Sequence, residues 1–245
     1  MVNLVIDIGN SFTKTAVFNN RKLTDTAVFK TIDEAAVRRF GNFDHAIVSS
    51  VDKDIRPLEE YLRSRSSYLR FHTGMFPPIV NHYKTSETLG LDRFAAVIGA
   101  SALYPHENNL VIDAGTCITY DFIDENRNYR GGSISPGLAM RFKAMHQFTE
   151  RLPLIEPDLE FTDSFGLDTA SAMRSGVQQG MFNEVLGFIN SYRDNYPQLQ
   201  IILCGGDVKL FDTRLKNSIF AHSVKIEPHL VLIGLNEVIH HHTND

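Results

Sequence analysis

The sequence lacks the features that mark several large classes of protein. No apolar run approaches the roughly 20 residues that a membrane-spanning helix needs. Asp7 stands where a secretory signal peptide would have its apolar centre, which argues against secretion. The formal net charge is −5, so the protein has no overall positive potential that would attract nucleic acid. We therefore expect a cytoplasmic protein with neither a membrane nor a nucleic acid as partner.

Cysteine and several nucleotide-binding motifs are also scarce or missing. The two cysteines, Cys117 and Cys204, lie in apolar β-like runs without metal-ligand spacing, so we expect reduced core thiols. The sequence contains no GxxxxGK(S/T) loop, no GxGxxG turn and no kinase catalytic loop. A P-loop enzyme and a dinucleotide enzyme are therefore disfavoured. Tryptophan is absent, which decides nothing about function.

What is present is ordinary for a globular protein. The chain has 245 residues, of which 43% are hydrophobic and 22% charged. This length suits one large domain or two of modest size. The tract His240-His241-His242 is interpreted as a solvated tail rather than as a metal site.

One short stretch occurs twice along the chain. Residues 4–10 (Leu-Val-Ile-Asp-Ile-Gly-Asn) and residues 110–116 (Leu-Val-Ile-Asp-Ala-Gly-Thr) each have the pattern of a buried strand that runs into a tight acidic turn. A second β-rich run and a polar turn follow each copy. Two such copies indicate two related domains rather than a solenoid, which needs roughly three or more short repeats.

The rest of the pattern predicts an α/β fold with mixed sheets flanked by helices. Residues 105–109 form the expected junction, which gives an N-terminal domain over 1–108 and a C-terminal domain over 109–245. Residues 74–85 have no periodicity and are predicted to form a loop. Helix starts are predicted at a capping box beginning with Thr31, at Ser135 with Pro136 in the first helical position, and at Thr169.

The doubled turn predicts a nucleotide cleft between the two domains. Gly9 and Gly115 let the backbone turn tightly and approach a ligand closely. Asp7 and Asp113 end the two strands, and their carboxylates would hold cations that screen a polyphosphate. The alternative is a pair of ordinary β-turns, since Asp and Gly favour turns. The matching copies favour the nucleotide interpretation. Donors to the phosphates would come from Asn10, Ser11 and Thr116.

Two further segments have more than one interpretation from the residues alone. In Gly90-Leu91-Asp92-Arg93, Asp92 either caps the following helix or serves as a general base. Arg93 is correspondingly a surface residue or an anion clamp in phosphoryl transfer. Gly205-Gly206 follows a buried strand and is either a nucleotide contact or a strand-to-helix turn.

Five segments are considered together, in chain order Asp7–Ser11, Gly90–Arg93, Asp113–Thr116, Gly131–Gly137 and Gly205–Gly206. Jointly they resemble the type III pantothenate kinases, and the resemblance covers nearly the whole chain. That family belongs to the superfamily of acetate and sugar kinases, heat-shock chaperones and actin. The resemblance implies two duplicated ribonuclease H-like domains around an interdomain cleft. It also implies ATP-dependent phosphorylation of pantothenate to 4'-phosphopantothenate, the first step of coenzyme A biosynthesis.

The resemblance implies roles for single residues as well. Asp92 is the expected general base, and Arg93 is expected near the substrate carboxylate. Asp113 is expected to hold a monovalent cation, potassium or ammonium, and Asp7 is a candidate ligand of magnesium. Thr169 is expected to reach the neighbouring site across a homodimer interface. Further expected contacts are Tyr83, Gly90 and Leu91 for pantothenate, and Ile8, Gly9, Asn10, Ser11, Phe12, Thr13, Lys14, Thr116, Gly205 and Gly206 for ATP.

Several alternatives stay open. Lys14 either reaches the phosphates or is an exposed strand residue, and the helix start at Ser135 is either an anion site or a plain cap. Cys204 stands where the family often has threonine, and a thiol donates only weakly. Two other functions are considered: a kinase of the same superfamily for another small acid or sugar, and a nucleotide-binding regulatory protein without turnover.

Overall fold

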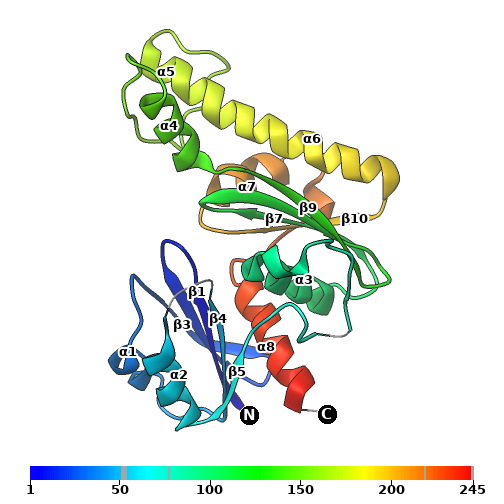
Figure 1. Cartoon of the computed structure of the whole chain (residues 1–245). Coiled ribbons are helices and arrows are strands. Elements are labelled where there is room, and N and C mark those ends of the chain that lie inside the picture. Colours follow the sequence, from blue (N-terminus) through cyan, green and yellow to red (C-terminus); the bar gives the residue numbers. More distant parts are fainter. Residues whose placement is uncertain (51–53, 77, 218, 244–245) are drawn as a thin grey trace. The chain divides into compact units, whose positions relative to one another are not determined.

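The computed structural model describes residues 1–50, 54–76, 78–217 and 219–243. The chain forms two compact units, whose elements are labelled in Figure 1. Unit 1 comprises Met1–His106, Glu125–Arg130 and His229–Asp245, and unit 2 comprises Glu107–Asp124 and Gly131–Pro228. The division into domains 1–108 and 109–245 stays a prediction.

Unit 1 is built from a mixed sheet with helices on both faces. In chain order its elements are β1 (Val2–Ile8), β2 (Thr13–Asn19), β3 (Lys22–Phe29), α1 (Glu34–Arg38), β4 (His45–Ser50), α2 (Arg56–Arg63), β5 (Ser67–Arg70), β6 (Val80–Asn81), the 3-10 turn η1 (Ser86–Thr88), α3 (Leu91–Leu103) and α8 (Leu230–Thr243).

Unit 2 repeats the arrangement of strands followed by helices. Its elements are β7 (Asn108–Ala114), β8 (Cys117–Ile123), β9 (Asn128–Pro136, whose first residues belong to unit 1), α4 (Leu138–Gln147), α5 (Thr169–Arg174), the π-helical turn η2 (Ser175–Gln179), α6 (Gly180–Asn195), β10 (Leu199–Cys204), α7 (Lys209–Lys216), the 3-10 turn η3 (Ala221–Ser223) and β11 (Val224–Ile226).

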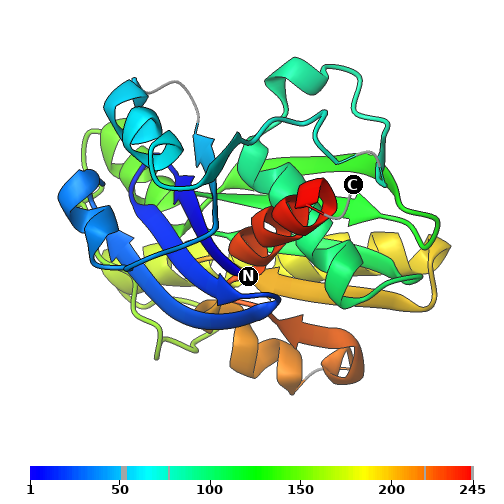
Figure 2. The same cartoon turned by 90° about the horizontal axis from the view of Figure 1, so that it is seen from below.

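The central strand of unit 1 is β1, and its successive side chains project alternately to the two faces of the sheet. The strand order is β3-β2-β1-β4-β5, with β1 antiparallel to β2 and parallel to β4. Leu4 and Ile6 join the apolar cluster formed with α1 and α2. Asn3 points to the other face, where its amide donates to Asn236 of α8 at 2.8 Å. Figure 2 shows α1 and α2 on one side of the sheet and α8 on the other.

Helices α3 and α8 cross at two glycines. A Cβ added to Gly99 would lie 2.4 Å from the carbonyl oxygen of Leu230. A Cβ added to Gly234 would lie 1.8 Å from the carbonyl oxygen of Ala95. The two backbones can approach this closely only because neither glycine carries a side chain. The crossing fixes α3, whose first turn contains Asp92.

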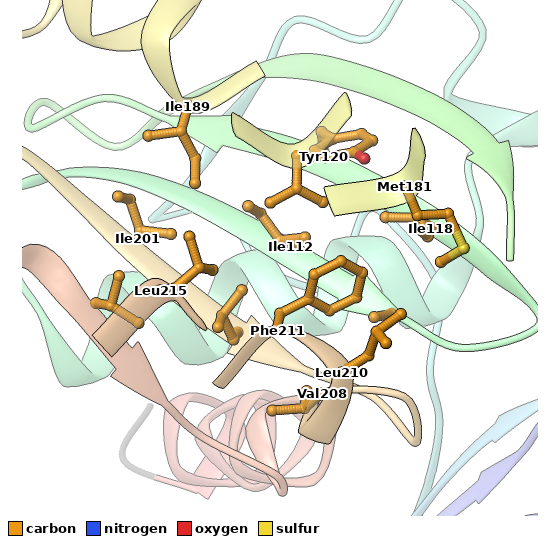
Figure 3. Packing of buried hydrophobic residues seen from close by; sticks show 14 of the residues in the cluster. Ile112, Ile118, Tyr120, Met181, Ile189, Ile201, Val208, Leu210, Phe211 and Leu215 are labelled. Atoms are coloured by element: carbon orange, nitrogen blue, oxygen red, sulfur yellow. The ribbon is translucent and has the colours of Figure 1, made fainter. Parts of the chain in front are cut away.

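The second sheet has six strands in the order β11-β10-β7-β8-β9-β6. Its centre is β7, antiparallel to β8 and parallel to β10. Alternate residues Leu110, Ile112 and Ala114 of β7 face a core that the helices of unit 2 complete. Figure 3 shows Ile112 of this core with Phe211 of α7 and Met181 of α6. The continuous apolar run predicted this strand correctly.

The predicted helix caps are wrong in detail. Asp33, and not Thr31, caps α1, because its carboxylate accepts from the amide of Ala36 at 2.8 Å. Asp168, and not Thr169, caps α5 in a reciprocal capping box with Ser171. In each case an aspartate stands close to the predicted residue and accepts the hydrogen bond instead.

The helix predicted to start at Ser135 begins later. Pro136 ends strand β9, and α4 starts at Leu138 after Gly137. A Cβ on Gly137 would lie 2.1 Å from the carbonyl oxygen of Gly115, so this position packs backbone against backbone. Ser135 therefore does not cap α4, and an anion site at the start of this helix stays a prediction.

Four smaller predictions can also be compared with the structure. Residues 74–85 include the two-residue strand β6, which is too short to produce a periodic pattern. His240 is buried within α8, so the solvated-tail interpretation is wrong for this residue. No disulfide appears in the described ranges; Cys204 is buried and Cys117 partly exposed. None of the helices described has the length and apolar character to cross a membrane.

Candidate active site

The first acidic turn lies at the end of β1. The Gly9 amide donates to the Phe12 carbonyl at 3.1 Å, which closes the turn between β1 and β2. Asp7 is 8% exposed, while Asn10 and Ser11 are exposed to solvent. The turn therefore presents polar groups at the end of a rigid central strand, as the sequence predicts.

The strand register brings Lys14 beside Asp7. The two residues are direct partners in the antiparallel β1–β2 pair. Opposed residues in such a pair project from the same face of the sheet. Lys14 is half-buried rather than fully exposed. Lys14 therefore projects from the same face of the sheet as Asp7, and its contact with the phosphates stays a prediction.

The segment Gly90–Arg93 forms the N-terminus of α3. Gly90 is the cap residue, and a Cβ there would lie 2.7 Å from Oδ1 of Asp92. That same oxygen accepts from the backbone amide of Arg93 at 2.8 Å. Asp92 is exposed at the first turn, and its carboxylate is oriented by this local bond. The carboxylate does not cap the helix, because α3 has no side-chain cap.

Arg93 lies in a buried aromatic cluster. It is 6% exposed, and its guanidinium carbon stands 5.4 Å from the ring centroid of Tyr83. Its Nη2 donates to the hydroxyl of Tyr129 at 3.4 Å. Tyr83 and Tyr129 are stacked with centroids 6.3 Å apart. Two predicted substrate residues, Tyr83 and Arg93, are therefore in contact.

Tyr129 is a site neighbour that the sequence reasoning missed. It is fully buried on β9 and also contacts Phe94, with ring centroids 6.0 Å apart. It lies 36 positions from Arg93, so no local spacing connects the two. Its only signal in the sequence is the alternation of β9, which places it on the inner face.

The second acidic turn lies in unit 2 at the end of β7. The Gly115 amide donates to the Cys117 carbonyl at 2.9 Å, as the Gly9 amide does in the first copy. Asp113 pairs with Cys204 of β10 and with Thr119 of β8. Thr116 is exposed at the tip of the turn. The glycine amide therefore closes both turns, but the second turn is shorter: its hydrogen bond spans two residues, whereas the bond from Gly9 to Phe12 spans three.

Gly205 packs directly against the second acidic turn. Its φ is +98°, and a Cβ would lie 2.2 Å from the Ala114 carbonyl oxygen and 2.4 Å from Oδ1 of Asp113. An L-residue with a side chain is strained at this φ and has no room there. Gly205 therefore lets the loop after β10 touch Asp113, whereas a Cβ on Gly206 would meet nothing within 4 Å.

Asp207 was also missed by the sequence reasoning. Its amide donates to the Ala114 carbonyl at 2.9 Å, which ties the β10 loop to the end of β7. Burial raises the pKa of the Asp207 carboxyl above its ordinary value. The available signal was an acidic residue beside a glycine pair at the end of a buried strand, although in the other two turns the aspartate precedes a single glycine.

A charged network supports the segment that follows β9. Arg141 of α4 donates to Glu184 of α6 at 2.6 Å and to the hydroxyl of Ser135 at 2.8 Å. The Tyr120 hydroxyl of β8 donates to the same glutamate at 2.8 Å. Burial is the largest cause of a pKa of Tyr120 far above its ordinary value. The network therefore holds the end of β9 against the start of α4.

Thr169 stands on a helix with an irregular turn. It is exposed at the first residue of α5, and the π-helical turn η2 separates α5 from α6. Buried Gln178 of this turn bonds both backbone groups of Asp158, at 2.7 and 3.1 Å. Such π-turns often occur at functional sites. Here the turn holds the irregular segment before α5 against α6.

The predicted site residues divide between the two units. Unit 1 carries Asp7 to Lys14, Tyr83 and Gly90 to Arg93; unit 2 carries Asp113, Thr116, Thr169, Gly205 and Gly206. Within the described residues no group of three or more His, Cys, Asp or Glu side chains is placed to hold a metal ion. A cation bound by one carboxylate together with nucleotide phosphates fits this arrangement, since Mg²⁺ is usually bound in that way.

Solved structures share this fold. A conserved Campylobacter jejuni protein assigned to the Baf family of transcriptional activators has a TM-score of 0.64 at 22% identity, covering 99% of this chain and 100% of its own. MreB5 of Spiroplasma citri, bound to ADP, has a TM-score of 0.52 at 12% identity, covering 100% and 98%. The chain thus has the actin-like α/β fold, with mixed sheets flanked by helices.

Comparison with known sequences identifies the family within this fold class. The model of the family described as type III pantothenate kinase matches residues 3–191. The type III pantothenate kinase of Bacteroides fragilis is 41% identical over 246 residues, covering 98% of both chains. The chain belongs to the type III pantothenate kinase family.

Proposed function

We propose that the protein transfers the γ-phosphoryl group of ATP to the primary hydroxyl of pantothenate, giving 4'-phosphopantothenate for coenzyme A biosynthesis. The observation that carries this proposal is the family match over nearly the full chain. A cytoplasmic location follows from the proposal, because ATP is its co-substrate.

Asp92 is the proposed general base. Phosphoryl transfer needs mainly positioning and charge neutralisation, plus a group that takes the proton of the acceptor hydroxyl. Asp92 is exposed, and its carboxylate is oriented by the Arg93 amide. Arg93, with Tyr83 stacked nearby, is the proposed partner of the pantothenate carboxylate. Gly90 and Leu91 complete the substrate segment.

The two acidic turns are the proposed phosphate and cation sites. Residues 8–14 of the first turn would contact the phosphates, and Asp7 would hold magnesium. Asp113 would hold a monovalent cation, potassium or ammonium, with Thr116, Gly205 and Gly206 toward the nucleotide. The contact of Gly205 with Asp113 supports this grouping within unit 2. The bound cations would neutralise charge on the phosphates.

A homodimer is proposed in which Thr169 reaches the site of the neighbouring copy. Large exposed apolar side chains are frequent in the segment that precedes Thr169 in the sequence: seven of the twelve such residues in the described chain lie between positions 134 and 167. An exposed apolar region of this kind marks an interaction surface. The seven are Ile134, Met140, Phe148, Leu154, Leu159, Phe165 and Leu167.

One coupled assay tests the proposal. The purified protein is supplied with ATP, Mg²⁺ and K⁺, and ADP release is followed with pantothenate and with a panel of other small hydroxy acids and sugars. We expect turnover with pantothenate and a lower rate when sodium replaces potassium. Turnover with another acceptor alone would assign a different kinase of the superfamily, while ATP binding without any transfer would favour a regulatory role.

A further inference from the structure

Unit 1 contains a cavity of about 470 Å³ that none of the residues proposed for pantothenate or ATP lines. Its size lies in the range of sites that bind small molecules, about 300–1,000 Å³. The walls come from the β2–β3 turn, the loop before β6, the C-terminal half of α3, the β8–β9 turn and α8. All of these segments belong to the same compact unit.

The charged groups of the cavity leave an excess of positive charge. Arg21 is neutralised by Glu237, since its Nε and Nη2 donate to the two carboxylate oxygens at 2.8 and 3.0 Å. Arg127 is half-buried and forms no ion pair with any residue that the structure describes. With no other acidic residue in the wall, the cavity favours an anion.

Arg127 is held in place by its backbone. It sits in the turn between β8 and β9 with a φ of +62°, which few non-glycine residues adopt. Its carbonyl accepts from the amide of Val80 at 3.0 Å, the bond that begins the pairing of β6 with β9. A guanidinium on a fixed turn needs less ordering when it binds a ligand.

His240 provides a second polar group. It is 6% exposed on α8, and its Nε2 has no hydrogen-bond partner among the described residues. A buried polar atom left unsatisfied costs about 1–3 kcal/mol. An apolar residue would avoid that cost in a helix whose neighbouring positions, Val238 and Ile239, are apolar and buried. An anionic oxygen in the cavity would accept a hydrogen bond from Nε2–H and satisfy it.

The remaining wall is largely apolar. Ile98 is fully buried on α3, and the ring of Phe76 packs edge-on against His241 with centroids 5.3 Å apart. Sites of this composition bind an apolar body and fix its orientation through a few polar groups. We propose that the cavity is a second ligand site of this protein, which takes a small amphipathic anion: its carboxylate, sulfonate or phosphate lies between Arg127 and His240, and its apolar part against Phe76 and Ile98.

The test uses 8-anilinonaphthalene-1-sulfonate, a fluorescent amphipathic anion, titrated into the full-length protein. We expect one saturable site whose affinity falls more than about tenfold in Arg127→Gln, because a charged hydrogen bond is lost. Ala102→Phe places a ring at an exposed wall position and should abolish binding. Arg130→Gln, on strand β9 three residues after Arg127 but outside the cavity, should leave the affinity unchanged.

Two controls keep the result decisive. Thermal unfolding of each variant verifies that it is folded, and His240→Leu replaces Arg127→Gln if the latter is not. Phe165→Ser removes part of the exposed apolar surface of unit 2. Probe fluorescence that is lost in this variant comes from that surface and not from the cavity. Equal affinity in wild type and Ala102→Phe, or binding lost only in Phe165→Ser, would overturn the proposal.

Discussion

At the scale of single residues, the proposed chemistry depends on one carboxylate. In Asp92→Asn we expect the turnover rate to fall by about 10²–10⁴-fold, the usual contribution of a general base. The amide can still accept a hydrogen bond from the Arg93 backbone, so the melting temperature should change little. Steady-state kinetics of pantothenate phosphorylation measures the loss.

Glu87→Gln is the matched control for this change. Glu87 is an exposed carboxylate in the turn just before α3, and we expect wild-type turnover when it is neutralised. A rate for Asp92→Asn close to that of Glu87→Gln would remove Asp92 from the mechanism.

Gly205 and Gly206 form a second pair of residues with opposite expectations. Gly205→Ala forces a Cβ against Ala114 at a φ of +98°, and the strain should lower the free energy of unfolding by at least about 1–3 kcal/mol. Gly206→Ala meets open space and should change it by no more than about 0.5 kcal/mol. Urea unfolding measures both, and equal stability of the two variants would contradict the observed packing.

At the scale of elements, the crossing of α3 and α8 supports the substrate segment. Gly234→Ala places a Cβ 1.8 Å from the Ala95 carbonyl oxygen, and such overpacking costs about 1–3 kcal/mol or more. Gly187→Ala, in the middle of α6 with nothing within 4 Å, should instead stabilise the protein by up to about 1 kcal/mol. Differential scanning calorimetry should show melting temperatures that move in opposite directions.

The network around Glu184 predicts a pH dependence of stability. Burial raises the pKa of this carboxyl, but hydrogen bonds from Arg141, Ser135 and Tyr120 outweigh burial, so the pKa lies below its ordinary value of 4.5. A depressed carboxyl pKa stabilises the fold above the ordinary value, and this stability is lost as the pH falls through the folded-state pKa. Glu184→Gln should therefore be less stable than wild type at pH 7, and the difference should shrink below about pH 4.5.

Urea unfolding between pH 7 and pH 3 measures this difference. Glu150→Gln is the control, since Glu150 is exposed near the end of α4 and should leave the pH profile unchanged. A constant gap between wild type and Glu184→Gln at all pH values would show that the carboxylate charge contributes nothing.

The elements also show how far sequence reasoning reaches. The continuous apolar runs and the doubled Asp-Gly turn predicted β1 and β7 well, because burial on both faces leaves a direct pattern in the residues. Cap positions such as Asp33 failed because several neighbouring residues could accept the same hydrogen bond. The contact of Arg93 with Tyr129 could not be predicted, since only the tertiary fold brings β9 to α3.

The same limit applies to the C-terminus. A run of three histidines gives no sign of burial, yet His240 lies inside unit 1 because α8 packs on the sheet and on α3. The residues around Gly205 illustrate the opposite case. The glycine pair was recognised as a close-approach position, but its partner, Asp113, emerged only from the pairing of β7 with β10.

At the scale of the whole molecule, the proposed dimer predicts complementation between two inactive variants. Thr169→Glu places a negative charge near the substrate carboxylate, and an acidic residue is well tolerated in the first turn of a helix. The Thr169→Glu variant is mixed with an equal amount of Asp92→Asn, and subunits are allowed to exchange. Half of the randomly formed dimers are then heterodimers, each with one intact site. About a quarter of all sites should therefore be active. The rate of the mixture measures this recovery. No recovery in a mixture that exchanges subunits would place Thr169 away from the neighbouring site.

The most direct test of the whole account is a crystal structure with pantothenate and a non-hydrolysable ATP analogue. We expect the Asp92 carboxylate at about 2.6–3.2 Å from the primary hydroxyl of pantothenate, the reach of a general base. Asp7 and Asp113 should both face the phosphates. A complex with the Asp92 carboxylate turned away from that hydroxyl, or with either of the other two aspartates on an outer surface, would contradict the account.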